Sequence, residues 1–205
     1  MERSGKETRM KIYHIPAPTP PCANTFLLIG ANGKAAAIDP GANAAEYLRL
    51  LEEHGARLTH ILLTHGHYDH VGAAAALREK TGAQVWLNPQ DTAGDRLFPF
   101  TAPDHAYTNG ETILVDSDLS FRVIATPGHS EGSVCLLCKD LLFTGDTLFA
   151  GDIGRTDLAG GDMGAMRQSL AKLCAAVTGD VRVLPGHEDF STMEYEKQHN
   201  PYLQG

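Results

Sequence analysis

The 205-residue chain lacks any long apolar run and contains few cysteines and few basic residues. No stretch approaches the roughly 20 consecutive apolar residues of a membrane-spanning helix, so no membrane association is expected. Residues 1–11 are polar and lack the apolar core of a signal peptide, which favours the cytoplasm. Met10 is an alternative start of the chain, in which case residues 1–9 are a disordered leader.

Cysteine is scarce, and the four residues are Cys22, Cys135, Cys138 and Cys174. In a cytosolic chain these thiols stay reduced, so no disulfide framework is expected. The Cys135-x-x-Cys138 spacing also occurs in redox and zinc pairs. A zinc knuckle needs a second such pair, which the sequence lacks, and the apolar run at 133–138 indicates a buried strand instead.

Lysine and arginine total 17 against 25 acidic residues, which gives a formal net charge of −8. Binding to nucleic acid needs a basic face, so nucleic acid is not expected as a partner. The composition, 42% hydrophobic and 20% charged, is ordinary for a globular protein. A chain of this length buries roughly 70% of its unfolded surface and needs no covalent staple.

Hydrophobic patterning predicts alternating strands and helices. Strands are expected at 25–29, 35–38, 60–64, 83–87, 112–115, 121–125, 133–138, 141–144 and 181–184. Helices are expected at 43–54, at 71–80 and after Asp162, where Met163, Met166, Leu170, Leu173 and Val177 share one face. Asn32-Gly33 is a hairpin signal between the first two strands, and Asn43 with Glu46 resembles a capping box.

Residues 88–110 show no periodicity and predict a long loop, of the kind that often serves as a lid or a binding loop. The order of the elements favours mixed sheets at the centre with helices outside, an α/β (α+β) fold. We predict one domain over residues 1–205, because no linker divides the chain.

The chemistry of the chain is concentrated in Thr64–His70, which reads Thr-His-Gly-His-Tyr-Asp-His. The segment follows a predicted buried strand and precedes a predicted helix. His65 and His67 are two residues apart, so in extended backbone they point the same way. Asp69 and His70 lie at the turn into the helix, where both can face a second point. Imidazole and carboxylate at this density suit zinc or iron.

Three later segments share a pattern in which an apolar strand and a glycine precede a possible ligand. These ligands are His129, Asp146 and His187. Glycine permits a sharp turn where a side chain must face a site. Because ligands collect outside strand ends in open α/β sheets, we expect all these groups to meet at one edge.

With these motifs, the sequence resembles the metallo-β-lactamase superfamily, and within it the glyoxalase II (hydroxyacylglutathione hydrolase) branch. The resemblance implies a four-layer αββα sandwich with two divalent metal ions at one edge of the sheets. Zinc is expected first, with iron or manganese as alternatives. The first metal is implied to bind His65, His67 and His129, the second Asp69, His70 and His187, and Asp146 to bridge them.

Two metals about 3.5–4 Å apart can share one water and lower its pKa to roughly 7. The bridging hydroxide is then the expected nucleophile, and Asp69 is expected to orient it. One metal is expected to polarise the substrate carbonyl and stabilise the oxyanion. Because histidine ligands must be neutral, activity is expected to be lost below about pH 6, near the ordinary histidine pKa of ~6.5.

A small-molecule acyl thioester suits such a site, because a thiol with a pKa of about 8.5 departs without a general acid. Esters and lactones stay open. In the resembled branch a basic residue in the segment that corresponds to Gly151–Asp157 holds the substrate's carboxylate, and Arg155 is the match. Arg155 could instead lie on the surface or pair with Asp152 or Asp157. Tyr68 is expected to line the pocket, with simple packing as the alternative.

The chain departs from the longer glyoxalase II enzymes, whose C-terminal helical domain holds glutathione. Here 18 residues follow His187 and include one lysine, Lys197. A short or different thioester is therefore also a candidate substrate. The sequence does not determine the oligomeric state.

The nearest enzymatic alternative is a mononuclear iron persulfide dioxygenase, which resembles this branch and uses only His65, His129 and Asp146. A β-lactamase fits less well, because His70 and Asp146 depart from the commonest class. A ribonuclease of the superfamily needs a basic surface. A non-enzymatic, metal-stabilised binding module needs closed coordination, whereas seven ligands for two metals leave room for water.

Overall fold

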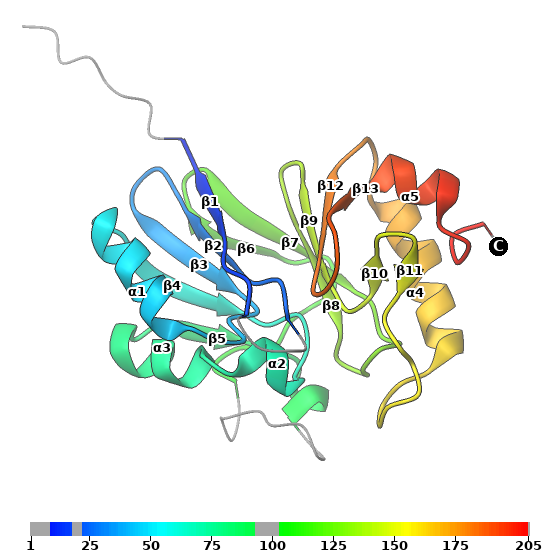
Figure 1. The fold of residues 1–205 in the computed structure, drawn as a ribbon, viewed down its shortest axis with the longest axis horizontal. Helices are drawn as coiled ribbons and strands as arrows, with labels where there is room; N and C mark the ends of the chain where they lie inside the picture. Colours follow the sequence, from blue (N-terminus) through cyan, green and yellow to red (C-terminus); the bar gives the residue numbers. More distant parts are fainter. Residues whose placement is uncertain (1–8, 18–21, 93–102, 205) are drawn as a thin grey trace, which may run out of the picture.

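Two facing sheets form the centre of the structure, a computed structural model that describes residues 9–17, 22–92 and 103–204 (Figure 1). In these residues the first sheet has five strands in the order β1-β2-β3-β4-β5. They are β1 (Lys11–His14), β2 (Phe26–Ile29), β3 (Lys34–Ile38), β4 (Arg57–Leu62) and β5 (Gln84–Trp86). The second sheet has six strands in the order β13-β12-β9-β8-β7-β6. They are β6 (Thr112–Asp116), β7 (Leu119–Ala125), β8 (Val134–Cys138), β9 (Leu141–Gly145), β12 (Arg182–Pro185) and β13 (Ser191–Thr192).

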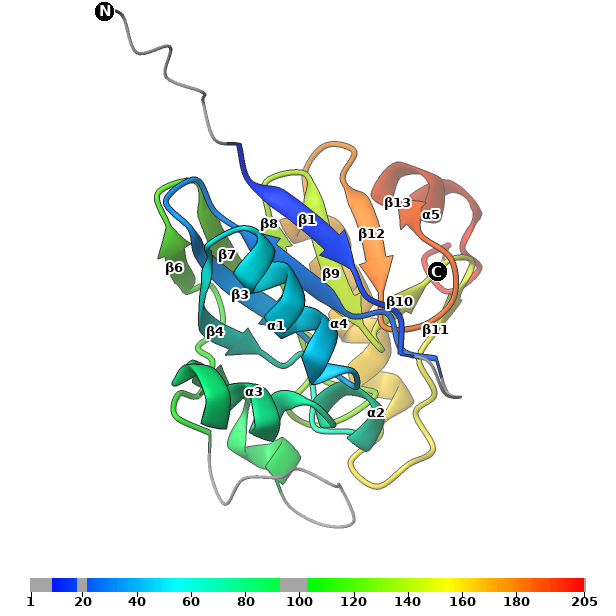
Figure 2. The same cartoon turned by 60° about the vertical axis from the view of Figure 1, so that its left-hand side comes forward.

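Helices cover the outer face of each sheet, which gives the expected four-layer αββα sandwich (Figures 1 and 2). Helices α1 (Ala44–Glu53) and α3 (Ala74–Thr81) lie on the first sheet, and α4 (Met163–Ala176) lies on the second. Shorter elements are α2 (Tyr68–Val71), the 3-10 turn η1 (Pro89–Thr92), the hairpin strands β10 (Leu148–Phe149) and β11 (Asp152–Ile153), and α5 (Met193–His199). None of the described helices is long and apolar enough to cross a membrane.

Three apolar layers hold the sandwich together. In β2, Leu27 packs toward α1 and α3, whereas Phe26 and Leu28 pack between the two sheets. This alternation follows from the period of two in an extended strand. A third layer joins the second sheet to α4 through residues such as Leu142 and Leu170. Both sheets are thus buried on two faces, which explains why the central strands read as continuous apolar runs.

Cys135 and Cys138 lie on opposite faces of β8. Cys135 packs against α4, and Cys138 packs between the sheets. Both thiols are free, and burial raises the pKa of each to about 11. The structural interpretation of this pair is confirmed, because the two side chains cannot meet and neither forms thiolate readily.

Several local predictions were wrong or incomplete. The capping box at the start of α1 does not form: Asn43 has a left-handed backbone, and its main-chain carbonyl, not its side chain, accepts from Glu46. The helix expected from residue 71 begins at Ala74. Strands β1, β10, β11 and β13, and helices α2 and α5, were not predicted. Residues 1–8 of the proposed leader and residues 93–102 of the proposed lid lie outside the described residues.

The predicted cap of α4 is confirmed and is testable. The Asp162 carboxylate accepts a hydrogen bond from the Ala165 amide at 2.7 Å. Asp162→Ala removes that acceptor and is expected to lower the free energy of unfolding by about 1 kcal/mol, with Asp162→Asn recovering most of it. Urea unfolding monitored by circular dichroism measures the change. An unaltered midpoint in the alanine variant would contradict the role of this cap.

Candidate metal centre

The ends of four strands meet at one edge of the sandwich. Strands β9 and β12 are parallel. Strand β7 runs in the same direction, because both β7 and β9 are antiparallel to β8. Their carboxyl ends therefore point to the same edge, where His129, Asp146 and His187 follow. From the facing sheet, β4 leads into His65 and His67, and the helical turn α2 carries Asp69 and His70.

One group of ligand atoms belongs to His65, His67 and His129, and these atoms lie within 4.8 Å of one another. His67 Nδ1 and His129 Nε2 are 2.8 Å apart. The His129 ring is oriented by its Nδ1–H, which donates to the carbonyl oxygen of Arg155 at 2.7 Å. That bond fixes the tautomer and leaves Nε2 free to face the centre.

A second group consists of Asp69, His70 and His187. The Nε2 atoms of His70 and His187 are 3.2 Å apart, and His187 Nε2 lies 3.1 Å from Asp69 Oδ2. His70 is fully buried, whereas the other two are partly exposed.

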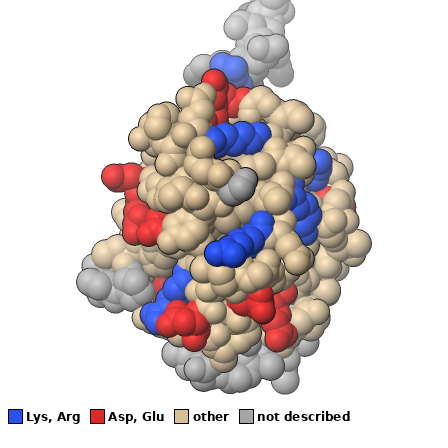
Figure 3. Space-filling view, turned by 90° about the vertical axis from the view of Figure 1, so that its right-hand side faces the viewer, with Lys and Arg blue, Asp and Glu red and all other residues tan. Residues whose placement is uncertain are grey.

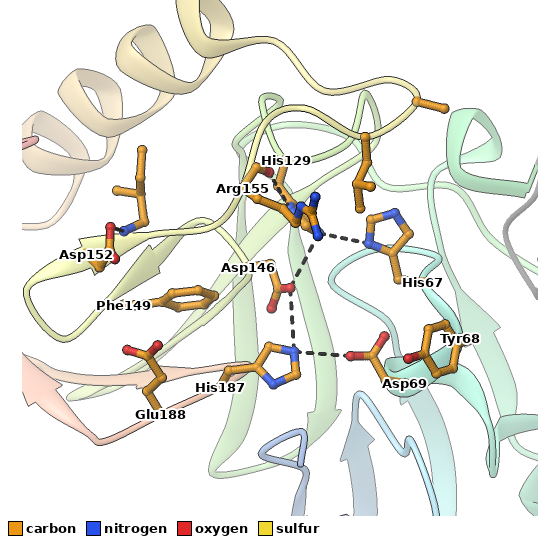
Figure 4. A pocket seen from close by; sticks show the side chains of 13 residues that line it. His67, Tyr68, Asp69, His129, Asp146, Phe149, Asp152, Arg155, His187 and Glu188 are labelled. Carbon is orange, nitrogen blue, oxygen red and sulfur yellow. Dashed lines mark hydrogen bonds and ion pairs between the residues drawn. The ribbon is translucent and has the colours of Figure 1, made fainter. Parts of the chain in front are cut away.

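Asp146 lies between the two groups (Figure 4). Its carboxylate is 3.4 Å from His129 Nε2 on one side and 3.4 Å from His70 Nε2 on the other. The structure therefore brings together all seven side chains that the sequence singled out, in the two groups that the family resemblance implied.

The glycines that precede these ligands are required by close approach. A Cβ atom at Gly186 would lie 2.4 Å from Asp146 Oδ1 and 2.6 Å from His70 Cε1. Gly145 has a left-handed φ of 48°, and a Cβ atom there would lie 2.2 Å from Thr64 Oγ1. No other residue type permits these contacts.

Asp39 forms hydrogen bonds to residues of the candidate metal centre, and it was not predicted from the sequence. Its two oxygens accept hydrogen bonds from the Thr64 amide at 2.7 Å and the Thr64 hydroxyl at 2.6 Å, and one lies 3.2 Å from His70 Nδ1. Although Asp39 also falls within reach of His65 and His70, its lone pairs are already engaged. We therefore assign it to orienting His70 rather than to a metal. Its position directly after an apolar strand was the available signal.

Asp91, in η1, joins the two loops that carry the first group, and no sequence signal pointed to it. Its fully buried carboxylate accepts from the Gly66 amide at 3.1 Å, the Ser130 hydroxyl at 2.6 Å and the Gly132 amide at 2.9 Å. Gly66 lies between the candidate ligands His65 and His67, and Ser130 follows His129 directly. One carboxylate thus holds both loops in register.

The two groups differ in protonation. Burial, and then the neighbouring histidines, hold the pKa of His65 well below its ordinary range, and burial lowers that of His67. Burial opposes the charged form of His70 too, but the carboxylates of Asp146, Asp39 and Asp69 outweigh it and raise its pKa to about 9. Without a cation, His65 and His67 are neutral at neutral pH, whereas His70 holds a proton.

The donor set fits divalent cations. His65 Nε2 and Asp146 Oδ1 are buried and lack any hydrogen-bond partner, and each such orphan costs about 1–3 kcal/mol. Two pairs of imidazole nitrogens also face each other at hydrogen-bond distance. Cations between these atoms would satisfy the orphans and separate the facing nitrogens. Imidazole and carboxylate ligands suit zinc, iron or manganese.

A cavity of about 570 Å³ opens over the centre. Its floor includes His67, Asp69, His129, Asp146 and His187. Its walls are formed by Tyr68, Phe149, Asp152, Ile153, Arg155, Leu158, Ala159 and Glu188. The centre is therefore accessible to a small molecule from one side.

Both residues expected to contact substrate lie in the cavity wall. Tyr68 is 53% exposed, so it is not a packed core residue. Arg155 pairs with Asp157 through two bonds of 2.7 Å, and both side chains are mostly exposed. Arg155 therefore pairs with Asp157, as in the alternative interpretation, and also lines the cavity.

A four-layer sandwich with histidines and aspartates gathered at its strand ends is the arrangement of a metal-dependent hydrolase or a related enzyme. A family model described as the metallo-beta-lactamase superfamily matches residues 19–187, and the chain belongs to this superfamily. Its members bind divalent metals, and the resemblance inferred from the motifs is confirmed.

Known proteins resemble the chain over nearly its full length. Hydroxyacylglutathione hydrolase GloC of Haemophilus influenzae is 33% identical over 195 residues, covering 88% of this chain and 92% of the relative. The solved structure of the BLEG-1 B3 metallo-beta-lactamase is 32% identical, with a TM-score of 0.84, and covers 95% of this chain and 100% of that one. TTHA1623 in a di-iron-bound form is 33% identical, with a TM-score of 0.81, covering 93% and 100%.

Removal of the Asp91 carboxylate tests its role. In a His187→Ala background, which leaves the first group intact, Asp91→Ala is expected to weaken zinc binding by about 10–100-fold, because the two ligand loops lose their common anchor. Competition with a chromophoric chelator measures the affinity. Asp116→Ala is the matched control, since Asp116 is a buried carboxylate that accepts from Asn32 and Lys34 elsewhere. Equal losses in both variants would refute a specific role for Asp91.

The protonation difference predicts two distinct pH dependences. A cation at His70 must displace a proton below pH about 9, so affinity at the second group should rise about tenfold per pH unit between 7 and 8.5. His65 and His67 hold no competing proton in that range, so the zinc affinity of the first group should change little with pH. Zinc titrations of His129→Ala and His187→Ala isolate the second and first groups. Equal slopes in the two variants would contradict this account.

Proposed function

We propose that the protein is a binuclear metal-dependent hydrolase of acyl thioesters resembling hydroxyacylglutathione. The observation that carries this proposal is the meeting of two histidine groups at Asp146, on the floor of a cavity of about 570 Å³. His65, His67 and His129 would hold one metal, Asp69, His70 and His187 the other, and Asp146 would bridge them. We propose zinc first, with iron or manganese as alternatives, and TTHA1623 shows that a similar chain binds two irons.

The residues of the chain supply the setting for this reaction. When bound, two divalent cations lower the pKa of a shared water and polarise the substrate carbonyl. Burial opposes ionisation of Asp69, but hydrogen bonding from His187 and the charge of His70 act together to lower the pKa of Asp69, so that its carboxylate stays charged. Asp69 lies at the cavity floor, where it can accept a hydrogen bond from the attacking water and orient it.

The leaving group narrows the substrate class. No lysine or cysteine is among the described residues that line the cavity, and the histidines there are proposed metal ligands. An amine leaving group needs a proton donor, whereas a thiol of pKa about 8.5 leaves as the thiolate. The cavity therefore suits a thioester better than an amide.

Arg155 is our candidate for holding the substrate's carboxylate. Its guanidinium already forms a two-pronged pair with the exposed carboxylate of Asp157. A substrate carboxylate could take the place of Asp157 in the same geometry. Tyr68 would flank the acyl group from the opposite wall. The name of the Haemophilus influenzae relative, a hydroxyacylglutathione hydrolase, supports this class of substrate.

Other activities fit the structure less well. On the face of α4 and α5, Figure 3 shows basic side chains separated by uncharged surface, with acidic side chains mainly toward the left and lower edges, rather than a continuous basic band. This gives no support to a ribonuclease. The open cavity argues against a closed, purely structural metal site. We also propose a cytoplasmic location, which fits the free cysteines of the described residues.

Thioester hydrolysis is tested with the purified, metal-loaded protein. We expect release of free thiol from S-lactoylglutathione, loss of activity after exhaustive chelation, and recovery on adding zinc, iron or manganese. His129→Ala is expected to lower kcat/KM by about a thousandfold or more, because one metal is lost. The exposed His199→Ala is the matched control and should retain activity.

The alternatives are separated by the same preparation. Oxygen consumption with glutathione persulfide and one iron per chain would indicate a dioxygenase, and hydrolysis of a cephalosporin would indicate a β-lactamase. Full thioester turnover after chelation would overturn the proposed mechanism.

A further inference from the structure

Two polar side chains near the C-terminus are completely buried yet take no part in the metal centre. They are Glu196 on α5 and Asn200 directly after it, and both are 0% exposed. Glu196 accepts from the Ser191 hydroxyl at 2.5 Å and from the Asn200 amide at 2.8 Å. Burial of such groups is costly unless every bond is made, so their remaining partners indicate what they hold in place.

Those partners lie on the β10–β11 hairpin. The Gly151 amide, at the turn of the hairpin, donates to Glu196 at 2.9 Å. The Asn200 amide donates to the carbonyl oxygens of Asp152 at 3.1 Å and Phe149 at 3.4 Å. The turn and both strands of the hairpin are thus bound to the last helix.

The hairpin depends on these bonds because it is small. Its strands pair through two residues each, Leu148 with Ile153 and Phe149 with Asp152. An isolated two-stranded hairpin is marginally stable even when longer. Contacts from outside must therefore fix its position, and α5 lies beside it on the same side of the molecule (Figure 1).

The same hairpin forms one wall of the cavity. Phe149, Asp152 and Ile153 line the cavity, and the Phe149 ring meets the His187 ring edge-on, with centroids 6.1 Å apart. Figure 4 shows Phe149 and Asp152 on the side of the metal centre opposite Tyr68. The chain then continues from β11 to Arg155.

We propose that Glu196 and Asn200 are positioning residues for substrate selection: through the β10–β11 hairpin, α5 sets the wall against which the thiol part of a thioester lies. The inference rests on the proposed function for its substrate but not for its structural content. The seven proposed metal ligands lie outside residues 148–153, so loss of these bonds should alter substrate affinity more than the chemical step.

The bonding pattern provides a conservative variant. In Glu196→Gln, the glutamine oxygen can still accept from Gly151 and Asn200, and its amide can donate to the Ser191 hydroxyl, which accepts as readily as it donates. Glu196→Ala and Asn200→Ala remove the bonds outright. Gln198→Ala is the matched control, because Gln198 is on the same helix, is exposed, and bonds only to Glu194 among the described residues.

The experiment compares two thioesters that share an acyl group, S-lactoylglutathione and the lactoyl thioester of 2-mercaptoethanol. For both alanine variants we expect KM for the glutathione thioester to rise about tenfold. We expect kcat, metal content and kinetics with the small thioester to stay within about twofold. Glu196→Gln and Gln198→Ala should match the wild type.

Hydrogen exchange of residues 148–153, measured by mass spectrometry, tests the same inference without substrate. Exchange should accelerate there in the alanine variants and stay unchanged in the sheets. Unchanged exchange in the hairpin, or equal loss of activity on both thioesters, overturns the proposal. If the wild type hydrolyses neither thioester, the proposed function fails, and the exchange of the hairpin alone decides whether α5 positions this wall.

Discussion

The structure depends on holding five imidazoles and two carboxylates close together at one largely buried point. Burial disfavours protonation of these imidazoles, and their closeness to one another adds to that effect, so that together they lower the pKa of His65. The carboxylates act in the opposite direction and leave His70 protonated. These effects act over short distances, so the pKa values of His65 and His70 shift in opposite directions, although both groups lie beside Asp146. A cation in place of the missing protons would stabilise such a cluster.

The rest of the fold supplies the rigidity that this cluster needs. Parallel and antiparallel strands, buried on both faces, bring their ends to one edge, and glycines there allow side chains to approach closely. Behind the ligands, Asp39 fixes one ring and Asp91 joins two loops. These supporting carboxylates connect segments that are distant in sequence, and a ligand displaced by even 1 Å would no longer converge on the centre.

The candidate metal ligands were easier to predict from the sequence than the residues that hold them in place. The ligands follow apolar runs and glycines, and this pattern is local, so each could be found without coordinates. Asp91 follows no such pattern, because its role is set by Gly66, Ser130 and Gly132, which reach it only through the tertiary fold. The same limit applies to Asn200, whose partners lie about 50 residues earlier. The capping box at Asn43 failed because the backbone turns left-handed there, which no propensity rule indicates.

We propose that two cations lie on either side of Asp146. Anomalous X-ray scattering from crystals of the metal-loaded protein tests it most directly, since it locates metals independently of activity. Two peaks about 3.5–4 Å apart are expected, one among His65, His67 and His129 and the other among Asp69, His70 and His187. A single peak at full loading, or peaks away from Asp146, would contradict it.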